Sequence, residues 1–356
     1  MTPLLAELVI AVVKILVIIG ALLGVFAVMT YFERRFLAFM QFRLGPNRTG
    51  PLGLLQPVAD GIKLFFKEEH VPDAANRWAF LGAPVLSIST ALMAIAVIPY
   101  GGPVTLPSWG FLPAWLAGRE VSLQIADLDI GLLYVFAISS LGVYGIVLAG
   151  WASNNKYSLL GGLRSSAQMF SYELSLGLSW VGVIMLAGSF RIQTIVESQA
   201  GGFWNWNVGA QFVGFVVYFV AATAEVSRIP FDLPEGEAEL VAGFHTEYSS
   251  MKFALFQMAE YVNMITVAVL CTNMFLGGWH PGIPGLPTGL VLGIPVFGLA
   301  YFGVKAFALL FFFIWLRGTL PRLRYDQLMR FGWLGLVPAA VVWILLMAAF
   351  VLWRGL

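Results

Sequence analysis

Long apolar runs separated by shorter polar stretches dominate the sequence. A helix that crosses the roughly 30 Å hydrocarbon core of a bilayer needs about 20 mostly apolar residues. Eight segments reach this length, and no strand-like alternation of apolar and polar residues competes with them. They are residues 5–31, 78–98, 129–151, 167–187, 208–227, 253–277, 290–316 and 333–353. The pattern predicts an all-α integral membrane protein, with residues 1–356 forming a single polytopic domain of about eight transmembrane helices.

A shorter helical pattern lies in the connection after the first segment, at residues 54–68. Its apolar residues recur at helical spacing and its polar residues fall between them: Leu54, Val58, Ile62, Phe65 and Phe66 against Asp60, Lys63 and Lys67. A short helix with one apolar and one charged face is typical of a segment that lies in the plane of the membrane interface.

The distribution of positive charge predicts the orientation of the chain. Fifteen of the 20 lysines and arginines lie in the odd-numbered connections between the predicted spans. Because lysine and arginine are retained on the cytoplasmic side, these connections are expected to face the cytoplasm. Both termini are then expected on the periplasmic side of a bacterial inner membrane.

Composition narrows the class of protein further. Hydrophobic residues make up 59% of the chain, charged residues 11%, and the mean hydropathy is +0.84, which excludes an ordinary water-soluble surface. A net charge of +1 offers no case for nucleic acid binding. Cys271 is the only cysteine and the three histidines are scattered, so neither a metal site nor an iron–sulfur cluster is expected. There is also no glycine-rich motif typical of nucleotide binding.

Three glutamates fall inside predicted spans, where an ionisable side chain is costly and marks a functional candidate. Glu173, Glu225 and Glu260 each lie about 6 to 12 Å below the predicted cytoplasmic surface, on three different helices, at about 1.5 Å per residue. If those helices adjoin, three carboxyls share one layer and can exchange protons. The structural alternative is that each carboxyl only hydrogen-bonds a neighbouring helix.

Two lysines also lie within predicted spans. Lys14 lies nearer the outer end of its span and is expected to extend its ammonium group to the interface. Lys305 is too central for this, so we expect a buried acidic partner or a role in a proton relay.

The connection from residue 228 to residue 252 is unusually acidic for a cytoplasmic segment. It carries Asp232, Glu235, Glu237, Glu239 and Glu247. The loop follows directly after the span with Glu225, so it is expected to supply protons to the carboxyl layer, to dock a partner, or to be an ordinary solvated loop.

Six stretches resemble one known family. They are Glu33-Arg34-Arg35; RLGPNRTGPLGLLQP from Arg43; GWASNNKYSLLGGLRSS from Gly150; Ser171-Tyr172-Glu173; PFDLPEGEAELVAGFHTEYS from Pro230; and RLRYDQLM from Arg322. They are similar to the H subunit of bacterial NADH–quinone oxidoreductase, the counterpart of mitochondrial complex I subunit 1. The resemblance covers nearly the whole chain. One departure is visible: Ser227 stands where the family commonly has asparagine.

The resemblance implies a subunit of a proton-translocating NADH:quinone oxidoreductase that is not catalytic alone. It implies a quinone substrate, ubiquinone or menaquinone, bound at a chamber shared with peripheral subunits, one of which carries the terminal iron–sulfur cluster. Flavin, clusters and NADH would belong to other subunits. Small membrane subunits and antiporter-like pumping subunits are the further implied partners.

The resemblance also suggests roles for the candidate residues. Glu173, Glu225 and Glu260 would begin the acidic path toward the pumping subunits, with Lys305 a further candidate, and the acidic loop would lie near the quinone chamber. Residues assigned to the chamber or to docking of the peripheral arm are Arg34, Arg35, Arg43, Arg48, Asp60 and Arg228. Docking is favoured for most of the arginines.

Two other functions remain open. A stand-alone proton or cation transporter would also explain charged residues within spans, and it predicts activity from the isolated chain. The related membrane subunit of a membrane-bound hydrogenase complex is the second alternative, and the GPNR-to-LLQP and PFDLPE strings favour the respiratory form over it.

Overall fold

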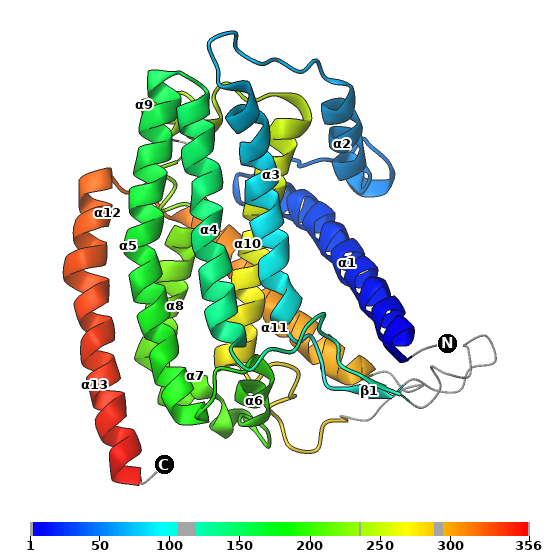
Figure 1. Cartoon of the computed structure of the whole chain (residues 1–356), viewed down its shortest axis with the longest axis vertical. Helices are drawn as coiled ribbons and strands as arrows, with labels where there is room; N and C mark the ends of the chain where they lie inside the picture. Colours follow the sequence, from blue (N-terminus) through cyan, green and yellow to red (C-terminus); the bar gives the residue numbers. More distant parts are fainter. Residues whose placement is uncertain (1–2, 106–118, 235, 288–294, 355–356) are drawn as a thin grey trace.

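The computed structural model describes residues 3–105, 119–234, 236–287 and 295–354, which form a bundle of long helices (Figure 1). The α-helices are α1 (Pro3–Met40), α2 (Gln56–Phe66), α3 (Arg77–Ala94), α4 (Gly131–Ala152), α5 (Lys156–Ala187), α6 (Ile192–Glu197), α7 (Asn207–Ala210), α8 (Phe212–Glu225), α9 (Glu237–Leu240), α10 (Ser250–Phe275), α11 (Val296–Thr319), α12 (Tyr325–Phe331) and α13 (Val337–Arg354). Strand β1 (Val104–Thr105) pairs antiparallel with β2 (Glu120–Val121). Short 3₁₀ turns occur at Pro51–Gly53, Ile95–Val97, Phe203–Asn205 and Gly243–His245, and Gly332–Leu336 is π-helical.

The described helices bear out the prediction of an all-α membrane protein. Seven helical segments among the described residues are long and apolar enough to cross a bilayer, and α8 is a shorter apolar helix. A helix satisfies its own backbone hydrogen bonds, which the hydrocarbon interior requires of any spanning segment. We refer to the end of the bundle with α2 as the α2 end and to the end with β1 as the hairpin end. Helix α1 starts and α13 finishes at the hairpin end (Figure 1).

Two helices extend well beyond the predicted spans at the α2 end. Helix α1 continues to Met40, so Glu33 lies within it rather than in a connection. Helix α5 begins at Lys156, eleven residues before the predicted start at 167, because the side chain of Asn155 caps it by accepting a hydrogen bond from the Tyr157 N–H at 2.9 Å. Hydropathy marks only the apolar part of a helix, so these charged ends were not predicted.

The segment predicted at 208–227 is shorter as a helix than expected. It is interrupted at Gln211, and α8 has 14 residues, which gives it a length of about 21 Å. This is less than the roughly 30 Å hydrocarbon core. Glu225 is its last residue, so the chain turns while still at membrane depth. The last two predicted spans also differ: α11 starts at Val296, and residues 288–294 lie outside the described part. The final helical segment starts at Tyr325.

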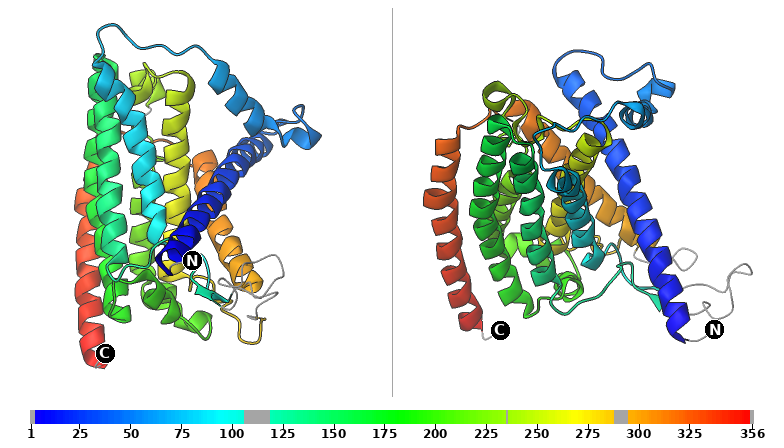
Figure 2. Two further views of the ribbon diagram at one scale, coloured as in Figure 1. Left: turned by 45° about the vertical axis from the view of Figure 1, so that its right-hand side comes forward. Right: turned by 45° about the horizontal axis from the view of Figure 1, so that its top comes forward.

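Close helix packing in the centre of the bundle depends on small residues. Helix α3 packs against α4 and α10, while α5 packs against α4, α8 and α13. Gly145 of α4 lies so close to Ser87 of α3 that a Cβ atom would be 3.0 Å from the Ser87 backbone N. In contrast, α1 is inclined to the other helices, and α2 lies beyond its end (Figure 2). Few of the described side chains of α1 are therefore buried within this chain.

Replacing Gly161 with alanine is expected to destabilise the protein. A Cβ at this position in α5 would lie 2.7 Å from the backbone N of Phe244 and 2.8 Å from the backbone of Gly243. Separating two backbones costs about 1–3 kcal/mol in the free energy of unfolding. Thermal unfolding of the detergent-purified protein measures this loss. The matched control is Gly82→Ala on α3, where a Cβ meets nothing within 4 Å; equal stability of the two variants would contradict the packing described here.

Candidate functional site

The three glutamates at membrane depth line two adjoining cavities. Glu173 of α5 and Glu225 of α8 line the first, Glu225 and Glu260 of α10 line the second, and Asn263 borders both. The helices that carry the three carboxyls therefore adjoin, as a shared layer requires. Glu225 is the residue that joins the two cavities.

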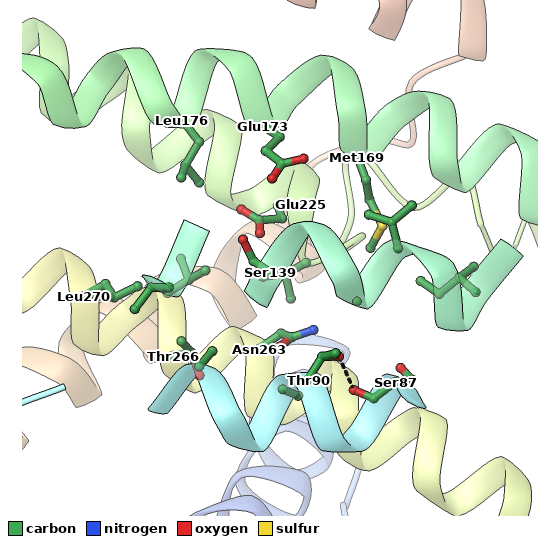
Figure 3. A pocket seen from close by; sticks show the side chains of 18 of the residues that line it. Ser87, Thr90, Ser139, Met169, Glu173, Leu176, Glu225, Asn263, Thr266 and Leu270 are labelled. Atoms are coloured by element: carbon green, nitrogen blue, oxygen red, sulfur yellow. Dashed lines mark hydrogen bonds between the residues drawn. The ribbon is translucent and has the colours of Figure 1, made fainter. Parts of the chain in front are cut away.

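The first cavity has a largely apolar lining into which a few polar groups project, and none of its lining residues is positively charged. The carboxyl groups of Glu173 and Glu225 point toward one another, with Ser139 beside them and Asn263 on the opposite wall (Figure 3). The hydroxyl of Ser140 donates to Glu173. Other lining residues with polar groups are Ser87, Thr90, Trp180, Tyr218 and Thr266. Hydroxyl and amide groups can hydrogen-bond a carboxyl in either protonation state, so this lining accommodates both forms.

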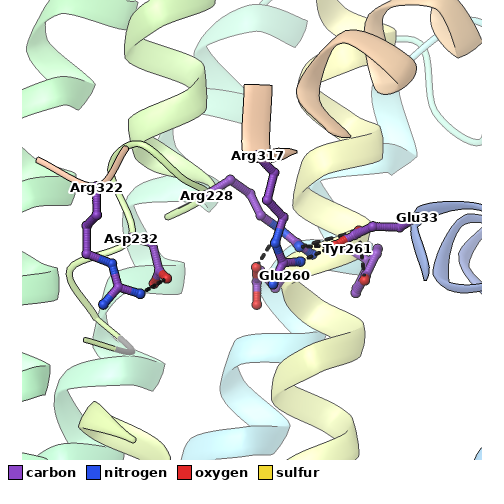
Figure 4. A network of polar contacts seen from close by, with 7 residues as sticks. All are labelled: Glu33, Arg228, Asp232, Glu260, Tyr261, Arg317 and Arg322. Atoms are coloured by element: carbon purple, nitrogen blue, oxygen red, sulfur yellow. Dashed lines mark hydrogen bonds and ion pairs between the residues drawn. The ribbon is translucent and has the colours of Figure 1, made fainter. Parts of the chain in front are cut away.

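A cluster of ion pairs lies next to the second cavity (Figure 4). The guanidinium of Arg228 contacts Glu33 of α1 at 3.1 Å and Glu260 of α10 at 2.7 Å. Tyr261 donates a hydrogen bond to Glu33 at 2.9 Å, and its ring lies 4.4 Å from the Arg228 guanidinium carbon. Arg317 of α11 forms a further ion pair with Glu33. We call these five residues, Glu33, Arg228, Glu260, Tyr261 and Arg317, the Arg228 cluster.

Arg228 is buried and remains charged within this cluster. Burial acts to lower the pKa of Arg228, but the carboxylates of Glu260 and Glu33 raise it well above its usual value. Glu260 belongs to the cluster and also lines the second cavity, so it links this cavity to the buried guanidinium of Arg228.

The turn after α8 positions Arg228. Ser227 adopts a positive φ of 56°, which reverses the chain at the end of the helix. The side-chain amide of Gln168 on α5 donates to the carbonyls of Ala224 and Phe231, both at 2.7 Å, and so holds the two sides of the turn. Arg228 lies between these two anchors and is directed into the protein.

The departure at Ser227 can be understood from this turn. Asparagine is enriched in the left-handed region, whereas serine adopts it less readily. The Ser227 hydroxyl oxygen is buried and has no hydrogen-bond partner among the residues that the structure describes. Serine therefore keeps the turn without contributing a polar contact.

The acidic loop is largely paired with basic or amide groups. Asp232 forms an ion pair with Arg322 at 2.5 Å, and Glu239 forms one with Arg164 at 2.6 Å. Glu247 accepts a hydrogen bond from Asn155 at 2.6 Å. Glu235 and the side chain of Glu237 lie outside the described part. The loop thus docks onto α5 and the segment before α12.

The predicted arginines at the α2 end separate into two groups. Arg34 pairs with Asp60 of α2, and Arg35 donates to the Leu52 carbonyl at 2.8 Å, so these two join α1 to the connection that follows it. Arg43 and Arg48 are exposed. Arg228, in contrast, is buried. The sequence left open whether it lines a chamber or docks the peripheral arm, and burial favours a role inside the protein.

Lys305 lies away from the carboxyl layer. Its ammonium group donates to the carbonyls of Leu276, Gly278 and His280, and no acidic partner is among its contacts in the described residues. Leu276 follows α10 sixteen residues after Glu260, a separation of about 24 Å along a helix. The structure therefore does not bring Lys305 together with the three glutamates.

Two members of the Arg228 cluster were missed by sequence reasoning. Glu33 precedes Arg34 and Arg35 just after the first predicted span, so it was not counted among the ionisable residues inside spans. Arg317 follows an apolar span and looked like an ordinary positive flank. The available signal was an acidic residue, Glu33, at the end of a long apolar pattern. Its partners Arg228 and Arg317 lie nearly 200 and 300 positions further along the chain. As for metal ions, the described residues contain no group of three or more His, Cys, Asp or Glu side chains placed to hold one.

Replacing Arg228 with methionine is expected to destabilise the protein strongly. The change leaves Glu260 without this cation and Glu33 with only Arg317 and Tyr261, and breaking one side of a buried ion pair costs about 3–5 kcal/mol in unfolding free energy. Thermal unfolding of the purified protein tests this. Arg324→Met is the control, because Arg324 pairs with Asp326 at an exposed site, where such a pair contributes about 0–1 kcal/mol. Similar losses in both variants would contradict the importance of the Arg228 cluster.

Comparison with known proteins gives a consistent family. A family model described as NADH dehydrogenase matches residues 13–348. The chain is 51% identical over 350 residues to the second NADH-quinone oxidoreductase H subunit of Koribacter versatilis, and 97% of each chain is covered. It is 50% identical over 345 residues to the first such H subunit of Geobacter metallireducens, also covering 97% of each chain. It is 48% identical over 355 residues to the H subunit of Syntrophotalea carbinolica, covering 100% of each chain.

Each of these matches extends over nearly the whole length of this chain and of its relative. The family model, at residues 13–348, includes all residues of the two cavities and of the Arg228 cluster. The chain therefore belongs to the NADH dehydrogenase family, together with the H subunits of NADH-quinone oxidoreductases.

Proposed function

We propose that this chain is the membrane subunit of a proton-translocating NADH:quinone oxidoreductase that forms the quinone-access chamber and begins the proton-coupling path. Its relatives are named as subunits of NADH-quinone oxidoreductases, which are enzyme complexes. The observation that carries the finer proposal is a continuous line of ionisable groups. It leads from Glu173 through Glu225 to Glu260, and from there through Arg228 to Glu33 on α1. This line connects the interior of the bundle with the inclined helix beside α2.

The three glutamates are suited to carry protons because they share two adjoining cavities, whose mainly apolar linings also hold hydroxyl and amide groups. No lysine, arginine or histidine lines either cavity in the described part of the chain, so a proton is the charge that can move between these carboxyls. Glu260 also contacts the fixed guanidinium of Arg228, which gives a proton at this residue a different free energy from one at Glu173. A difference of this kind is required if proton position is to respond to chemistry at one end of the line.

The quinone substrate would be bound at the α2 end, between α1, α2 and α10. Helix α2 exposes a continuous apolar face made of Val58, Ile62, Phe65 and Phe66, which suits contact with lipid and with an isoprenoid tail. Arg34 and Asp60 hold this helix to α1. Peripheral subunits would close the chamber and supply the electrons, so flavin and iron–sulfur clusters are assigned to them and not to this chain.

The α2 end would face the cytoplasm, since most lysines and arginines lie there, and both termini would face the periplasm of a bacterial inner membrane. The paired acidic loop, including Asp232, Glu239 and Glu247, would then lie at the junction with the peripheral arm. Arg43 and Arg48 are exposed at the same end and are suited to dock acidic partner surfaces. Small membrane subunits and antiporter-like subunits would contact the lipid-facing helices.

Glu225→Gln is expected to lower proton translocation and quinone reduction together. Glutamine keeps the size of the side chain but cannot exchange a proton, and loss of such a group reduces a proton-transfer rate by about a hundredfold or more. NADH-driven quinone reduction and proton uptake in inverted membrane vesicles give the two readouts. Glu197→Gln, at an exposed glutamate near the hairpin end, is the control and should be unaffected. Unchanged pumping in the Glu225 variant would refute the proposed path.

The tagged chain is expected to purify in mild detergent with NADH:quinone reductase activity. The proposal requires partner subunits, because the chain has a single cysteine, which is buried, and so cannot hold a cluster by itself. Flavin, iron content and quinone reduction are measured on the eluate. A chain that elutes alone and conducts protons or cations in liposomes would instead establish the stand-alone transporter.

A further inference from the structure

The ammonium group of Lys305 is enclosed by backbone oxygens at the hairpin end. It donates to the carbonyl of Leu276 at 2.7 Å, of Gly278 at 2.9 Å and of His280 at 2.6 Å. A lysine ammonium has three hydrogens, and here each one has an acceptor. All three bonds exist only while the amine is protonated, so releasing a proton would break this arrangement. The geometry around the group therefore fits the protonated amine.

The turn that follows α10 is shaped to surround this cation. Gly277 and Gly278 both have positive φ values, 71° and 51°, in the turn whose carbonyls at Leu276, Gly278 and His280 converge on the ammonium group. A Cβ on Gly277 would lie 2.4 Å from the indole nitrogen of Trp206, and one on Gly278 would lie 2.5 Å from Val196. The two glycines therefore allow the turn, Trp206 and Lys305 to pack together.

Trp206 covers the remaining side of the cation. The Lys305 nitrogen lies 4.1 Å from the centre of its ring, within range for a cation–π interaction. Trp206 immediately precedes α7, and α7 leads into α8. Lys305 therefore contacts both the end of α10 and the start of the α7–α8 segment.

Buried amide side chains join the same two segments. Gln199 accepts hydrogen bonds from the backbone N–H of Asn207 at 3.2 Å and of Gly277 at 3.0 Å, and it donates to the Asn273 carbonyl at 2.9 Å. The side chain of Asn207 donates to the Met274 carbonyl at 2.9 Å. We call this set, Gln199, Trp206, Asn207, Lys305 and residues 273–280, the Lys305 clamp.

The clamp joins, at the hairpin end, the two segments that carry Glu225 and Glu260. Helices α8 and α10 both extend between the clamp and the α2 end, in opposite chain directions. Between the clamp and the second cavity, the Tyr218 hydroxyl of α8 donates to the Val267 carbonyl of α10 at 2.8 Å. Beyond that bond, Glu225 and Glu260 line the second cavity together. Helices transmit a displacement along their length, so a shift at the clamp would change the separation of these carboxyls.

We propose that Lys305 is a positioning residue that fixes α8 against α10 from the hairpin end and so sets the spacing of Glu225 and Glu260, without itself transferring protons. The proposal deepens the proposed function and rests on it for its consequence in pumping. Its structural part, the fixed position of α7 and α8, can be measured independently.

The test compares Lys305→Met and Lys305→Arg in the assembled complex in inverted vesicles. The methionine variant removes the cation, and we expect the protons translocated per NADH to fall at least about twofold, with a shifted pH profile. Arginine keeps a permanent cation with several donors, so we expect it to restore most of the coupling. Lys14→Met is the matched control, because Lys14 is also a lysine within a span but contacts Ser122 and Gln124, and it should leave the coupling ratio unchanged.

A second variant and a second measurement keep the test decisive if Lys305→Met fails to assemble. Gly278→Ala retains the lysine but displaces one carbonyl of the clamp, and we expect a smaller change in the same direction. Hydrogen–deuterium exchange should increase in residues 207–218 of either variant. Unchanged exchange in this segment would overturn the positioning role.

The functional outcomes separate the two proposals. An arginine variant as defective as the methionine variant would overturn the positioning role and indicate proton transfer by Lys305 instead. If Lys305→Met couples normally while Glu225→Gln is defective, the role of the clamp is overturned and the proton path stands. Normal pumping in Glu225→Gln would refute the proton path, and the exchange measurement would still decide whether Lys305 positions α8.

Discussion

The arrangement of the α2 end depends on the neutralisation of buried charge by Arg228. Its guanidinium contacts one carboxylate from α1 and one from α10, and Arg317 brings α11 to the same point. A charge at this depth cannot be left uncompensated, because desolvating it costs several kcal/mol. Four segments that are far apart in the sequence are therefore held together at one place. The ion pairs of Glu33 hold the inclined α1 to the bundle together with the packing of Phe32 and Phe36 against α11.

The early end of α8 makes this arrangement possible. Because the helix stops at Glu225, two ionisable residues only three positions apart face different surroundings. Glu225 borders cavities that have no positive charge in their described lining, whereas Arg228 is enclosed by carboxylates. One short turn, held by Gln168, thus separates the two cavities from the buried ion pairs of Arg228.

Depth counting from the sequence was enough to select Glu173, Glu225 and Glu260. It works because the apolar pattern shows where each helix meets the membrane surface, and the rise per residue then gives the depth of each residue. The same reasoning failed for Glu33 and Arg317, which lie at helix ends where polar residues are unremarkable. It also suggested an acidic partner or relay role for Lys305, since a sequence does not show that backbone carbonyls can surround a cation. Glycines at 277 and 278 were the only local sign of such a turn.

The sequence by itself determined the fold class, the approximate positions of the helices, three of the acidic residues inside the bundle and, through long unambiguous motifs, the family. These features depend on local composition and spacing, which are readable along one chain. Only the tertiary structure decided which charges pair and which remain beside a cavity. It placed Glu33 with Arg228, enclosed Lys305 in carbonyls, and joined the three glutamates through Glu225. Such pairing depends on which helix faces adjoin, and this is settled by packing between distant segments rather than by any pattern along the chain.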